Sequence, residues 1–435
     1  MDNCQEYSQD CSQECSHESY SDYCKTCNSV HFRNNFAHWT SGDLNLDKLI
    51  QNSQLNANSP MKLIEWIEYS NLENIELIAH GGFGSVYKAI WKDGPIMDLD
   101  FNKSKWRREN KKEVAVKKFQ NVTNVSSAFL NEVKFNLEMN DATYGINTIQ
   151  IYGITRDQQN GEYAIVTEFK NGGNLRQMIK QNHSNLTWKV IIEILMRICE
   201  GLCSVHDSKH FHKDLHSGNI LHSIHPNNKI KSVISDFGLC RPMDQSSTDK
   251  TPYGVLPFVA PEVLLGKEFT EAADIYGFGM IMSELISGEA PFVDREYDEN
   301  LTLAICYGQR PQIPEYTPKP YAVLMKRCWD LVPTNRPTTE KLYDQIDNLR
   351  NVLFIDNLSH LNEDLGLEIK EIKEIKEAFN QEREDKWKAR LAELATNPIP
   401  LKKSQNSLTS KRLNYSQSLS QKLSVEDWNK LKFTD

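Results

Sequence analysis

The sequence lacks an apolar run long enough to cross a membrane. A spanning helix needs about twenty consecutive apolar residues, whereas the longest apolar stretch, residues 275–286, is interrupted by two glycines, Ser283 and Glu284. The first residues, MDNCQEYSQD, also lack the basic start and the apolar core of a secretory signal peptide. We therefore predict no transmembrane helix and a cytoplasmic protein, with the nucleus as the alternative location.

An excess of positive charge is also missing. The 435 residues carry 50 Lys and Arg against 59 Asp and Glu, a formal net charge of -9. Proteins bind nucleic acids mainly by neutralising phosphates with lysine and arginine, so this balance argues against a nucleic-acid partner. The hydrophobic content of 39% is sufficient for packed cores in a chain of this length.

The ten cysteines do not indicate a disulfide framework, because thiols stay reduced in the cytosol. Residues 1–45 form a polar, cysteine-rich arm in which Cys11, Cys15, Cys24 and Cys27 make a CxxxC and a CxxC pair. Four thiolates could bind tetrahedral zinc, which would supply folding energy that the arm lacks. The alternative, favoured by the short gap between the pairs, is a disordered arm with reduced cysteines.

Regular structure is predicted after a connecting segment, residues 46–74. Short alternating strands are expected at residues 75–91, 114–119, 149–155 and 163–169, followed by apolar-faced helices after Gly173. Residues 75–353 are therefore predicted to be an α+β domain, with a small antiparallel sheet followed by a larger helical part. The polar insertion at residues 92–112 is predicted to be a surface loop.

The C-terminal part of the chain divides into two segments. Residues 354–400 are a helical extension, in which residues 368–394 contain no Gly or Pro and place Glu382 and Glu384 four residues before Lys386 and Lys388. The apolar stripe is too short for a strong coiled-coil prediction, so we expect a helix packed on the preceding domain. Residues 401–435 are a tail of serines and basic residues, predicted to be disordered and open to phosphorylation.

Two acidic motifs occur in the helical part of the domain. HKDLHSGN spans residues 212–219, and Asp236-Phe237-Gly238 follows it. A carboxylate such as Asp214 can accept the proton of an attacking hydroxyl, while Asn219 and Asp236 offer oxygen ligands to Mg²⁺. Alone, each residue could be a cap or turn residue, but the ordered set points to phosphoryl transfer.

A glycine-rich segment and a lysine-bearing strand precede these motifs. Residues 78–86, IAHGGFGSV, would bring backbone amides close to triphosphate oxygens, and VAVK follows at residues 114–117. The ammonium of Lys117 would need an anionic partner in a partly buried cleft. Glu132 is the predicted partner, because apolar residues surround it, and Glu138 is the alternative.

The order and spacing of these motifs, with Ala260-Pro261-Glu262 downstream, resemble a eukaryotic protein kinase. The resemblance covers about Ile75 to Leu353 and implies a bilobal fold, with a small antiparallel-sheet lobe holding one main helix and a larger helical lobe. It implies transfer of the γ-phosphate of ATP to hydroxyls of protein substrates with Mg²⁺, in intracellular signalling. The sequence carries no signal for an oligomeric state.

The resemblance also implies a role for individual residues. The catalytic residues implied are Asp214, Lys117, Glu132, Asn219 and Asp236, of which Asn219 and Asp236 would bind Mg²⁺. The nucleotide site implied comprises Ile78, Ala79, His80, Gly81, Gly82, Phe83, Gly84, Ser85, Val86, Ala115, Lys117, the gatekeeper Thr167, the linker residues Glu168 and Phe169, and Leu221. An ion pair between Glu262 and Arg336 and a backbone-holding Asp274 are further implications.

The subgroup is indicated by His216, two residues after Asp214. HKDLHSGN looks like the tyrosine-kinase-like group of serine/threonine kinases, so serine and threonine acceptors are favoured over tyrosine. The text from Tyr23, YCKTCNSVHFRNNFAHWTSG, is similar to an expanded kinase family of arbuscular mycorrhizal fungi. Candidate activation-loop phosphorylation sites are Ser246, Ser247, Thr248, Thr251 and Tyr253.

Four positions depart from the kinase pattern. Ala79 replaces the first glycine of the loop, Asn136 an apolar residue, Lys213 an arginine, and Val255 a threonine whose hydroxyl would bond Asp214. Ala79, Asn136 and Val255 support an alternative function, a pseudokinase scaffold that binds nucleotide or partners without efficient catalysis, whereas Lys213 makes activation by loop phosphorylation less assured.

Overall fold

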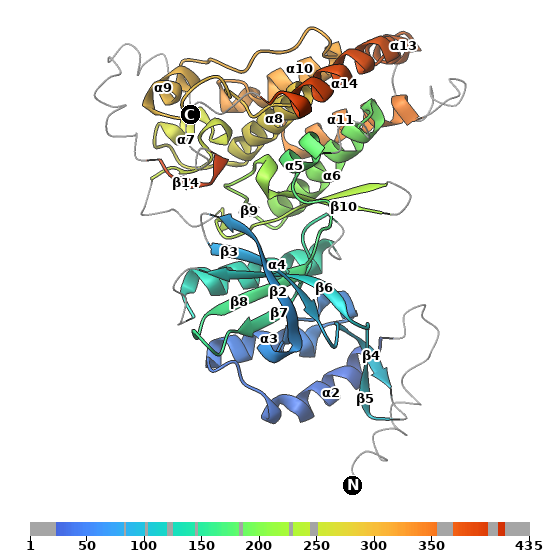
Figure 1. Ribbon diagram of the computed structural model, residues 1–435, viewed down its shortest axis with the longest axis vertical. Helices are drawn as coiled ribbons and strands as arrows, with labels where there is room; N and C mark the ends of the chain where they lie inside the picture. The colour runs from blue at the N-terminus through green and yellow to red at the C-terminus, as the bar shows by residue number, and fades with distance from the viewer. Residues whose placement is uncertain are drawn as a thin grey trace. The chain divides into compact units, whose positions relative to one another are not determined.

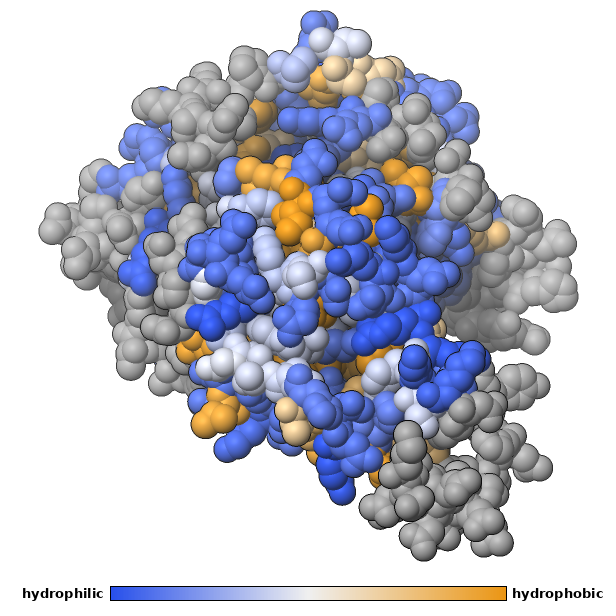
Figure 2. Space-filling model, turned by 60° about the horizontal axis from the view of Figure 1, so that its bottom comes forward, coloured by the Kyte–Doolittle hydropathy of each residue, from blue (hydrophilic) through white to orange (hydrophobic). Residues whose placement is uncertain are grey.

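The computed structural model describes residues 23–81, 84–100, 103–119, 125–143, 147–181, 186–225, 229–243, 251–354, 369–398 and 408–413. The chain divides into two compact units, with the boundary between Phe169 and Lys170 (Figure 1). On the face drawn in Figure 2, hydrophilic residues predominate and hydrophobic residues gather in small separate patches. Within the described ranges we find no helix with the length and apolar character needed to span a membrane.

The first unit is built on a six-stranded sheet in the order β1-β7-β8-β6-β3-β2. Neighbouring strands are antiparallel except β1, which pairs parallel with β7. The strands are β1 (Glu65–Trp66), β2 (Leu72–Gly81), β3 (Gly84–Trp91), β6 (Lys112–Phe119), β7 (Ile151–Arg156) and β8 (Tyr163–Glu168). The predicted mixed α and β class, with an antiparallel sheet before a helical part, is confirmed.

Among its described residues, this unit has three α-helices: α2 (Lys25–Asn35), α3 (Leu44–Asn56) and α4 (Ser127–Thr143). Apolar residues of α3 and α4 form one core with β7 and β8: Leu46, Ile50, Phe129, Val133, Ile151, Ile154 and Ile165. Asp43 caps α3 by accepting hydrogen bonds from the backbone amides of Asn45 and Leu46 at 2.9 and 3.0 Å. The prediction of a disordered arm is therefore wrong for residues 23–45. The few apolar side chains of this polar segment, such as Tyr23 and Phe32, are buried against residues outside the arm that include Leu63 and Ile96.

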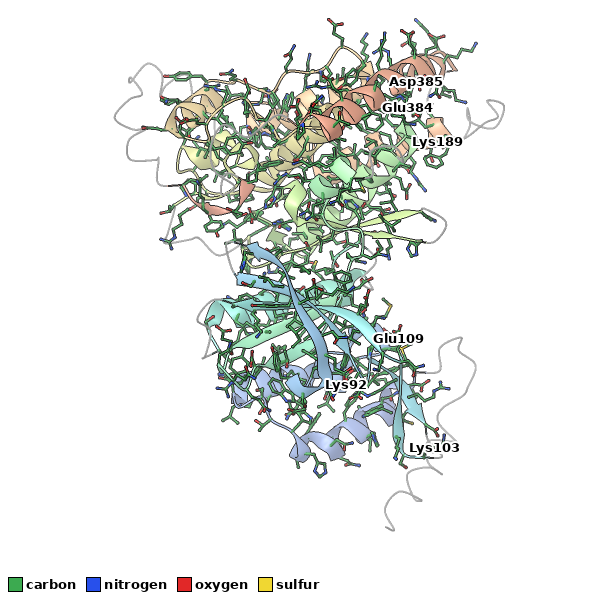
Figure 3. The ribbon with its side chains drawn as sticks, viewed as in Figure 1. Lys92, Lys103, Glu109, Lys189, Glu384 and Asp385 are labelled. Carbon is green, nitrogen blue, oxygen red and sulfur yellow. The ribbon has the colours of Figure 1, made fainter. Side chains whose placement is uncertain are left out.

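The predicted surface loop at residues 92–112 contains a β-hairpin. β4 (Ile96–Asp100) pairs antiparallel with β5 (Lys105–Arg108), and Lys103 lies at its turn (Figure 3). The Trp106 ring packs 4.3 Å from that of Phe32 in α2, and Arg108 donates to Glu65 at 2.6 Å. These contacts are with residues distant in sequence, which explains why local polarity alone predicted a loop.

The second unit contains most of the helices. They are α5 (Leu175–Gln181), α6 (Trp188–Asp207), α7 (Pro261–Leu264), α8 (Glu271–Ser287), α9 (Glu299–Cys306), α10 (Lys319–Cys328) and α11 (Thr339–Phe354). Its short strands are β9 (His210–Phe211), β10 (Ile220–Ile224), β11 (Ile230–Ile234), β12 (Arg241–Pro242), β13 (Tyr253–Gly254) and β14 (Lys411–Arg412). The side chains of residues 273–286 in α8 are all buried, so this helix is the centre of the unit.

Within residues 369–398, the described part of the C-terminal extension, the chain forms two helices where one was predicted. α13 (Ile369–Ala378) ends before Asn380, whose side chain caps α14 (Gln381–Thr396) by accepting a bond from the Arg383 amide at 3.0 Å. Glu384 of α14, labelled in Figure 3, accepts a hydrogen bond from the backbone of Trp188 at 2.7 Å. α14 is therefore packed on the second unit, which is the arrangement predicted for the helix of the extension.

Candidate active site

The glycine-rich segment forms the β2–β3 hairpin of the first unit. Its two strands stay paired as far as Gly81 opposite Gly84, and Gly82 and Phe83 lie outside the described residues. A Cβ at Gly84 would meet the carbonyl oxygen of Lys118 at 2.0 Å, so β6 itself requires glycine there. Among the described residues, the atom nearest to a Cβ at Gly81 would be the carbonyl oxygen of Gly84 at 3.7 Å. Packing against β6 therefore explains why residue 84 is a glycine, whereas no contact among the described residues requires a glycine at position 81.

The other residues of the hairpin lie mainly at the surface of their own unit. Ile78 is 46% exposed, and Ala79 pairs with Val86 across the hairpin. His80 Nδ1 lies 3.0 Å from the Ser85 hydroxyl. An exposed isoleucine on a glycine-rich hairpin is an apolar surface that the first unit leaves uncovered.

Lys117 and Glu132 form an ion pair in the first unit. The Nζ of Lys117 in β6 donates to Oε1 of Glu132 in α4 at 2.7 Å, and the two side chains are 15% and 5% exposed. Glu138, the alternative partner, is exposed on the same helix. Asn136 donates its amide to the Glu132 carbonyl at 2.7 Å, which holds this polar side chain in a buried position.

The predicted adenine-contacting residues lie at the end of β8. Thr167 is paired with Ala115 of β6 and Ile151 of β7. The amide of Glu168 donates to the Gln150 carbonyl at 2.9 Å, so this N–H is already used within the sheet. The Lys88 ammonium lies 4.7 Å from the centre of the Phe169 ring. Leu221 belongs to the second unit, where it bridges to Asn174.

Asp214 lies in the loop between β9 and a short 3-10 helix, Ser217–Asn219, and its side chain is 3% exposed. The Nδ2 of Asn219 donates to the Asp214 carbonyl at 2.9 Å and lies 3.4 Å from its Oδ2. Because the amide nitrogen of Asn219 is directed at Asp214, the amide oxygen is the atom left for a cation. Carboxylate and amide oxygens are the ligands that Mg²⁺ prefers.

Asp236 is placed near Asn219 by the β10–β11 pair. Ile220 lies opposite Ile234, so the residues before β10 and after β11 are at the same end of this ribbon. Ser235 donates both its amide and its hydroxyl to the Asn219 carbonyl at 2.9 Å. Asp236 has a φ of 62°, a conformation that costs a non-glycine residue about 1–3 kcal/mol and is concentrated at functional sites.

Asp274 of α8 holds the loop that carries Asp214. It accepts hydrogen bonds from the backbone amides of His212 at 2.9 Å and Lys213 at 3.0 Å, and its Oδ2 lies 3.0 Å from His206 Nε2. Burial lowers the pKa of His212, although Asp274, Asp214 and Asp236 all oppose this change. Lys213 has a φ of 70°, a second left-handed non-glycine residue beside the buried carboxylates.

Glu262 and Arg336 form a buried bidentate pair. Arg336 donates to the two oxygens of Glu262 at 2.6 and 2.8 Å, and to the carbonyls of Ala272 and Asp330 at 2.8 and 2.9 Å. This geometry links residues separated by 74 positions. It satisfies the guanidinium almost completely inside the second unit.

A polar network that the sequence analysis missed supports the same loop. Ser217 donates its hydroxyl to Glu284 at 2.6 Å, and Arg176 donates to Glu284 at 2.8 Å and to Ser217 at 2.9 Å. The network joins α5, the loop and α8. The only sign of this network in the local sequence is a glutamate, Glu284, within an apolar helical stretch. Such a residue indicates that a polar partner exists but does not identify it.

The zinc prediction receives no support. Cys11 and Cys15 lie outside the described residues, and the sulfurs of Cys24 and Cys27 are 3.4 Å apart. Throughout the described part of the chain, no cluster of three or more His, Cys, Asp or Glu side chains is suited to a metal ion. Among the predicted phosphorylation sites, Ser246, Ser247 and Thr248 are outside the described residues, whereas Thr251 and Tyr253 are within them.

Comparison with known proteins assigns the chain to a family. The family model "Protein tyrosine and serine/threonine kinase" matches residues 72–346. The chain is 30% identical over 291 residues to Dual specificity protein kinase splA of Dictyostelium discoideum, covering 63% of this chain and 11% of that protein. Two further relatives from this organism, named as probable serine/threonine-protein kinases, are 33% identical over 198 residues (roco8) and 29% identical over 308 residues. These matches cover 43% and 68% of this chain, and 11% and 29% of the relatives.

The chain thus spans less than a third of the length of each of these relatives. The family match itself covers more than half of the chain and includes both the Lys117–Glu132 pair and the loop of Asp214. The chain belongs to the protein tyrosine and serine/threonine kinase family.

Proposed function

We propose that this protein transfers the γ-phosphate of ATP to serine or threonine hydroxyls of proteins, as a member of the tyrosine-kinase-like group. The observation that carries the proposal is the loop in which Asn219 holds Asp214 at 2.9 Å while Asp274 fixes the loop backbone. The preference for serine and threonine rests on the resemblance of HKDLHSGN to that group. The cytoplasmic location and the relation to kinases of mycorrhizal fungi stay predictions.

In this proposal the first unit binds the nucleotide. Lys117 neutralises phosphate charge, and the ion pair with Glu132 keeps its ammonium in one position. Gly81, for which the fold has no need, gives the nucleotide room at the hairpin backbone. Ile78, 46% exposed, offers an apolar surface to the purine.

The second unit supplies the proton acceptor and the metal ligands. Asp214 accepts the proton of the acceptor hydroxyl, and its hydrogen bond from Asn219 holds the carboxylate in place. Asn219 and Asp236 would bind Mg²⁺, which neutralises charge on the phosphates when it is bound. Because phosphoryl transfer requires mainly alignment and charge neutralisation, these residues are sufficient for the chemistry.

A pseudokinase scaffold is the second candidate. It is favoured by Val255, which is 1% exposed and has no hydroxyl to offer Asp214. Ala79 and Asn136 also depart from the kinase sequence pattern and favour the same candidate function.

One assay separates the two functions. The whole chain, Asp214→Asn and Lys117→Met would be incubated with radiolabelled ATP, Mg²⁺ and casein, and phosphoamino acids would be analysed. We expect label on serine and threonine, reduced about 100-fold or more in Asp214→Asn because a proton acceptor contributes about 10²–10⁴-fold. Glu138→Gln, at the exposed glutamate of α4, is the matched control and should keep the wild-type rate. Equal, background-level incorporation by wild type and Asp214→Asn would favour the scaffold.

A further inference from the structure

A short segment of the C-terminal tail is bound beside the loop of Asp214. β14, drawn in red in Figure 1, pairs antiparallel with β13, with Lys411 opposite Gly254 and Arg412 opposite Tyr253. The Leu413 amide donates to the Pro252 carbonyl at 2.8 Å, and the Tyr253 hydroxyl donates to the Ser410 carbonyl at 3.1 Å. The prediction of a disordered tail is therefore wrong for residues 408–413, which we call the tail strand.

Both ends of the tail strand are anchored by leucines. Leu413 is 1% exposed, so its side chain is buried although the neighbouring Lys411 and Arg412 are exposed. Leu408 lines a cavity together with Leu391 and Leu394 of α14. Backbone pairing to a strand, combined with buried side chains at fixed positions, is how proteins bind extended peptides.

The strand that receives the tail runs directly past Asp214. Gly254 has a φ of 138°, and a Cβ there would lie 3.3 Å from Asp214 Oδ1 and 2.9 Å from the Val259 side chain. Lys411 pairs with this glycine, so the residue before it, Ser410, is carried towards the catalytic loop. The Ser410 hydroxyl lies 3.1 Å from His216 Nε2, which itself is 3.7 Å from Asp214 Oδ1.

The hydrogen-bond pattern of His216 determines how the Ser410 hydroxyl is bound. The Gly218 amide donates to His216 Nδ1 at 3.0 Å, so Nδ1 carries a lone pair and the neutral ring carries its hydrogen on Nε2. His216 then donates to the Ser410 oxygen, and the hydroxyl hydrogen of Ser410 is left for another acceptor. The ring is held in place, because a Cβ at Gly218 would meet it at 2.6 Å and Phe258 lies 5.9 Å from its centre.

We propose that the tail strand is an intramolecular peptide substrate and that Ser410 is its phosphoacceptor. This inference rests on the proposed kinase function. The Ser410 oxygen forms a bond to the γ-phosphorus of ATP as the bond between that phosphorus and the β,γ-bridging oxygen breaks. The hydroxyl proton passes to Asp214, ADP leaves with the bridging oxygen, and no oxidant or further reactant is required. His216 is a positioning residue that orients the acceptor oxygen.

The same geometry describes the class of substrate that the site accepts. A substrate would bind as an added strand along Tyr253 and Gly254, with a serine followed by two basic residues and then an apolar residue that is buried. A phosphate on Ser410 would carry about two negative charges into the surroundings of the buried Asp214, so the product strand should be released.

The experiment uses the whole chain, ATP and Mg²⁺, with phosphate at Ser410 measured by peptide mass spectrometry. We expect Ser410 to be phosphorylated at a first-order rate that does not change over a dilution series of the protein. Leu413→Asp, which places a charge at the buried anchor, should lower this rate about tenfold or more while casein phosphorylation is retained. Ser404→Ala and Ser416→Ala are the matched controls in the tail and should leave the Ser410 rate unchanged.

The outcomes separate this inference from the proposed function. Casein phosphorylation without phosphate on Ser410 would overturn the inference and leave the kinase function standing. A Ser410 rate proportional to protein concentration, or one that is equal in wild type and Leu413→Asp, would overturn intramolecular binding. Transfer to neither casein nor Ser410 would overturn both. Phosphorylation of a synthetic LTSKRL peptide by Leu413→Asp would support the substrate class.

Discussion

The indole rings of Trp188 and Trp387 stack with their centroids 4.7 Å apart and their planes within 11° of parallel. Trp188 begins α6, and Trp387 lies in the middle of α14 and is fully buried. The Trp387 indole also donates to the Leu285 carbonyl of α8 at 3.3 Å. α14 is therefore packed against the second unit and adds the Trp387 side chain to its core.

Trp387→Ala should destabilise the second unit by about 3–5 kcal/mol, because it removes a large buried side chain together with its stacking interaction with Trp188. Lys386→Ala changes the neighbouring residue of the same helix, whose ion pair with Glu382 is exposed, and should leave stability close to that of wild type. The measurement is urea unfolding of both variants. Identical unfolding midpoints for Trp387→Ala and wild type would show that α14 is not a structural part of this unit.

Glu132→Gln should lower kcat/KM for ATP by about 10-fold or more, because it removes the carboxylate that holds the Lys117 ammonium in position. The exposed Glu138, six residues along α4, is the control, and Glu138→Gln should match wild type. Steady-state kinetics with varied ATP make the comparison. If both variants lost activity equally, a specific contribution of the Lys117–Glu132 ion pair to kcat/KM for ATP would be excluded.

The two hairpin glycines should fail in different ways. Gly84→Ala should destabilise the first unit by about 1–3 kcal/mol, because its Cβ would overlap the Lys118 carbonyl oxygen. Gly81→Ala has room in the fold and should retain stability while the KM for ATP rises. Thermal unfolding and ATP kinetics of each variant test this separation. A stable Gly84→Ala protein, or a normal KM for Gly81→Ala, would contradict the assignment.

His222 should make the stability of the second unit depend on pH. Burial lowers the pKa of His222 from 6.5 to about 3, with a smaller contribution from Lys170. Below pH 6.5 the unfolded chain binds a proton that the folded one does not, so stability present at neutral pH is lost as the pH falls. Between pH 6.5 and 5 this amounts to about 2 kcal/mol.

The test compares the free energy of unfolding at several pH values between 7.5 and 5. His222→Gln should flatten this dependence, whereas His225→Gln, at an exposed histidine three residues later, should preserve it. Parallel curves for wild type and His222→Gln would show that the loss of stability comes from other groups.

The Glu262–Arg336 pair should be costly to break. Arg336→Ala leaves a buried carboxylate without a partner and should destabilise the second unit by about 3–5 kcal/mol. Arg336→Lys keeps the charge but loses the bidentate geometry, so an intermediate loss is expected. Arg327→Ala, at an exposed arginine of α10, is the control and should remain near wild type. Differential scanning calorimetry would rank the three, and an unaffected Arg336→Ala would refute the prediction.

Patterns local to the sequence predicted the strands and the chemical motifs. Burial alternates along the middle of β6, whereas β7 and β8 are buried along almost their whole length. Both kinds of apolar pattern are visible in the sequence without knowing the partner strands. The spacing of Lys117, Asp214, Asn219 and Asp236 is equally a property of the chain. The i,i+4 pairs of Glu382 with Lys386 and of Glu384 with Lys388 form at 2.7 and 2.8 Å, as local helix geometry requires.

Contacts between distant segments decided the rest. α2, α3 and the β4–β5 hairpin are too polar to be predicted from their own residues, because the apolar surface that stabilises them belongs to other elements. β14 has two residues, and its partner Gly254 lies 157 positions away from Lys411. The amino-acid sequence by itself determined that the residue types of the protein kinase motifs are present and in order. Only the tertiary structure decided that Ser410 lies against His216, because strand pairing over such a separation leaves no local signal in the chain.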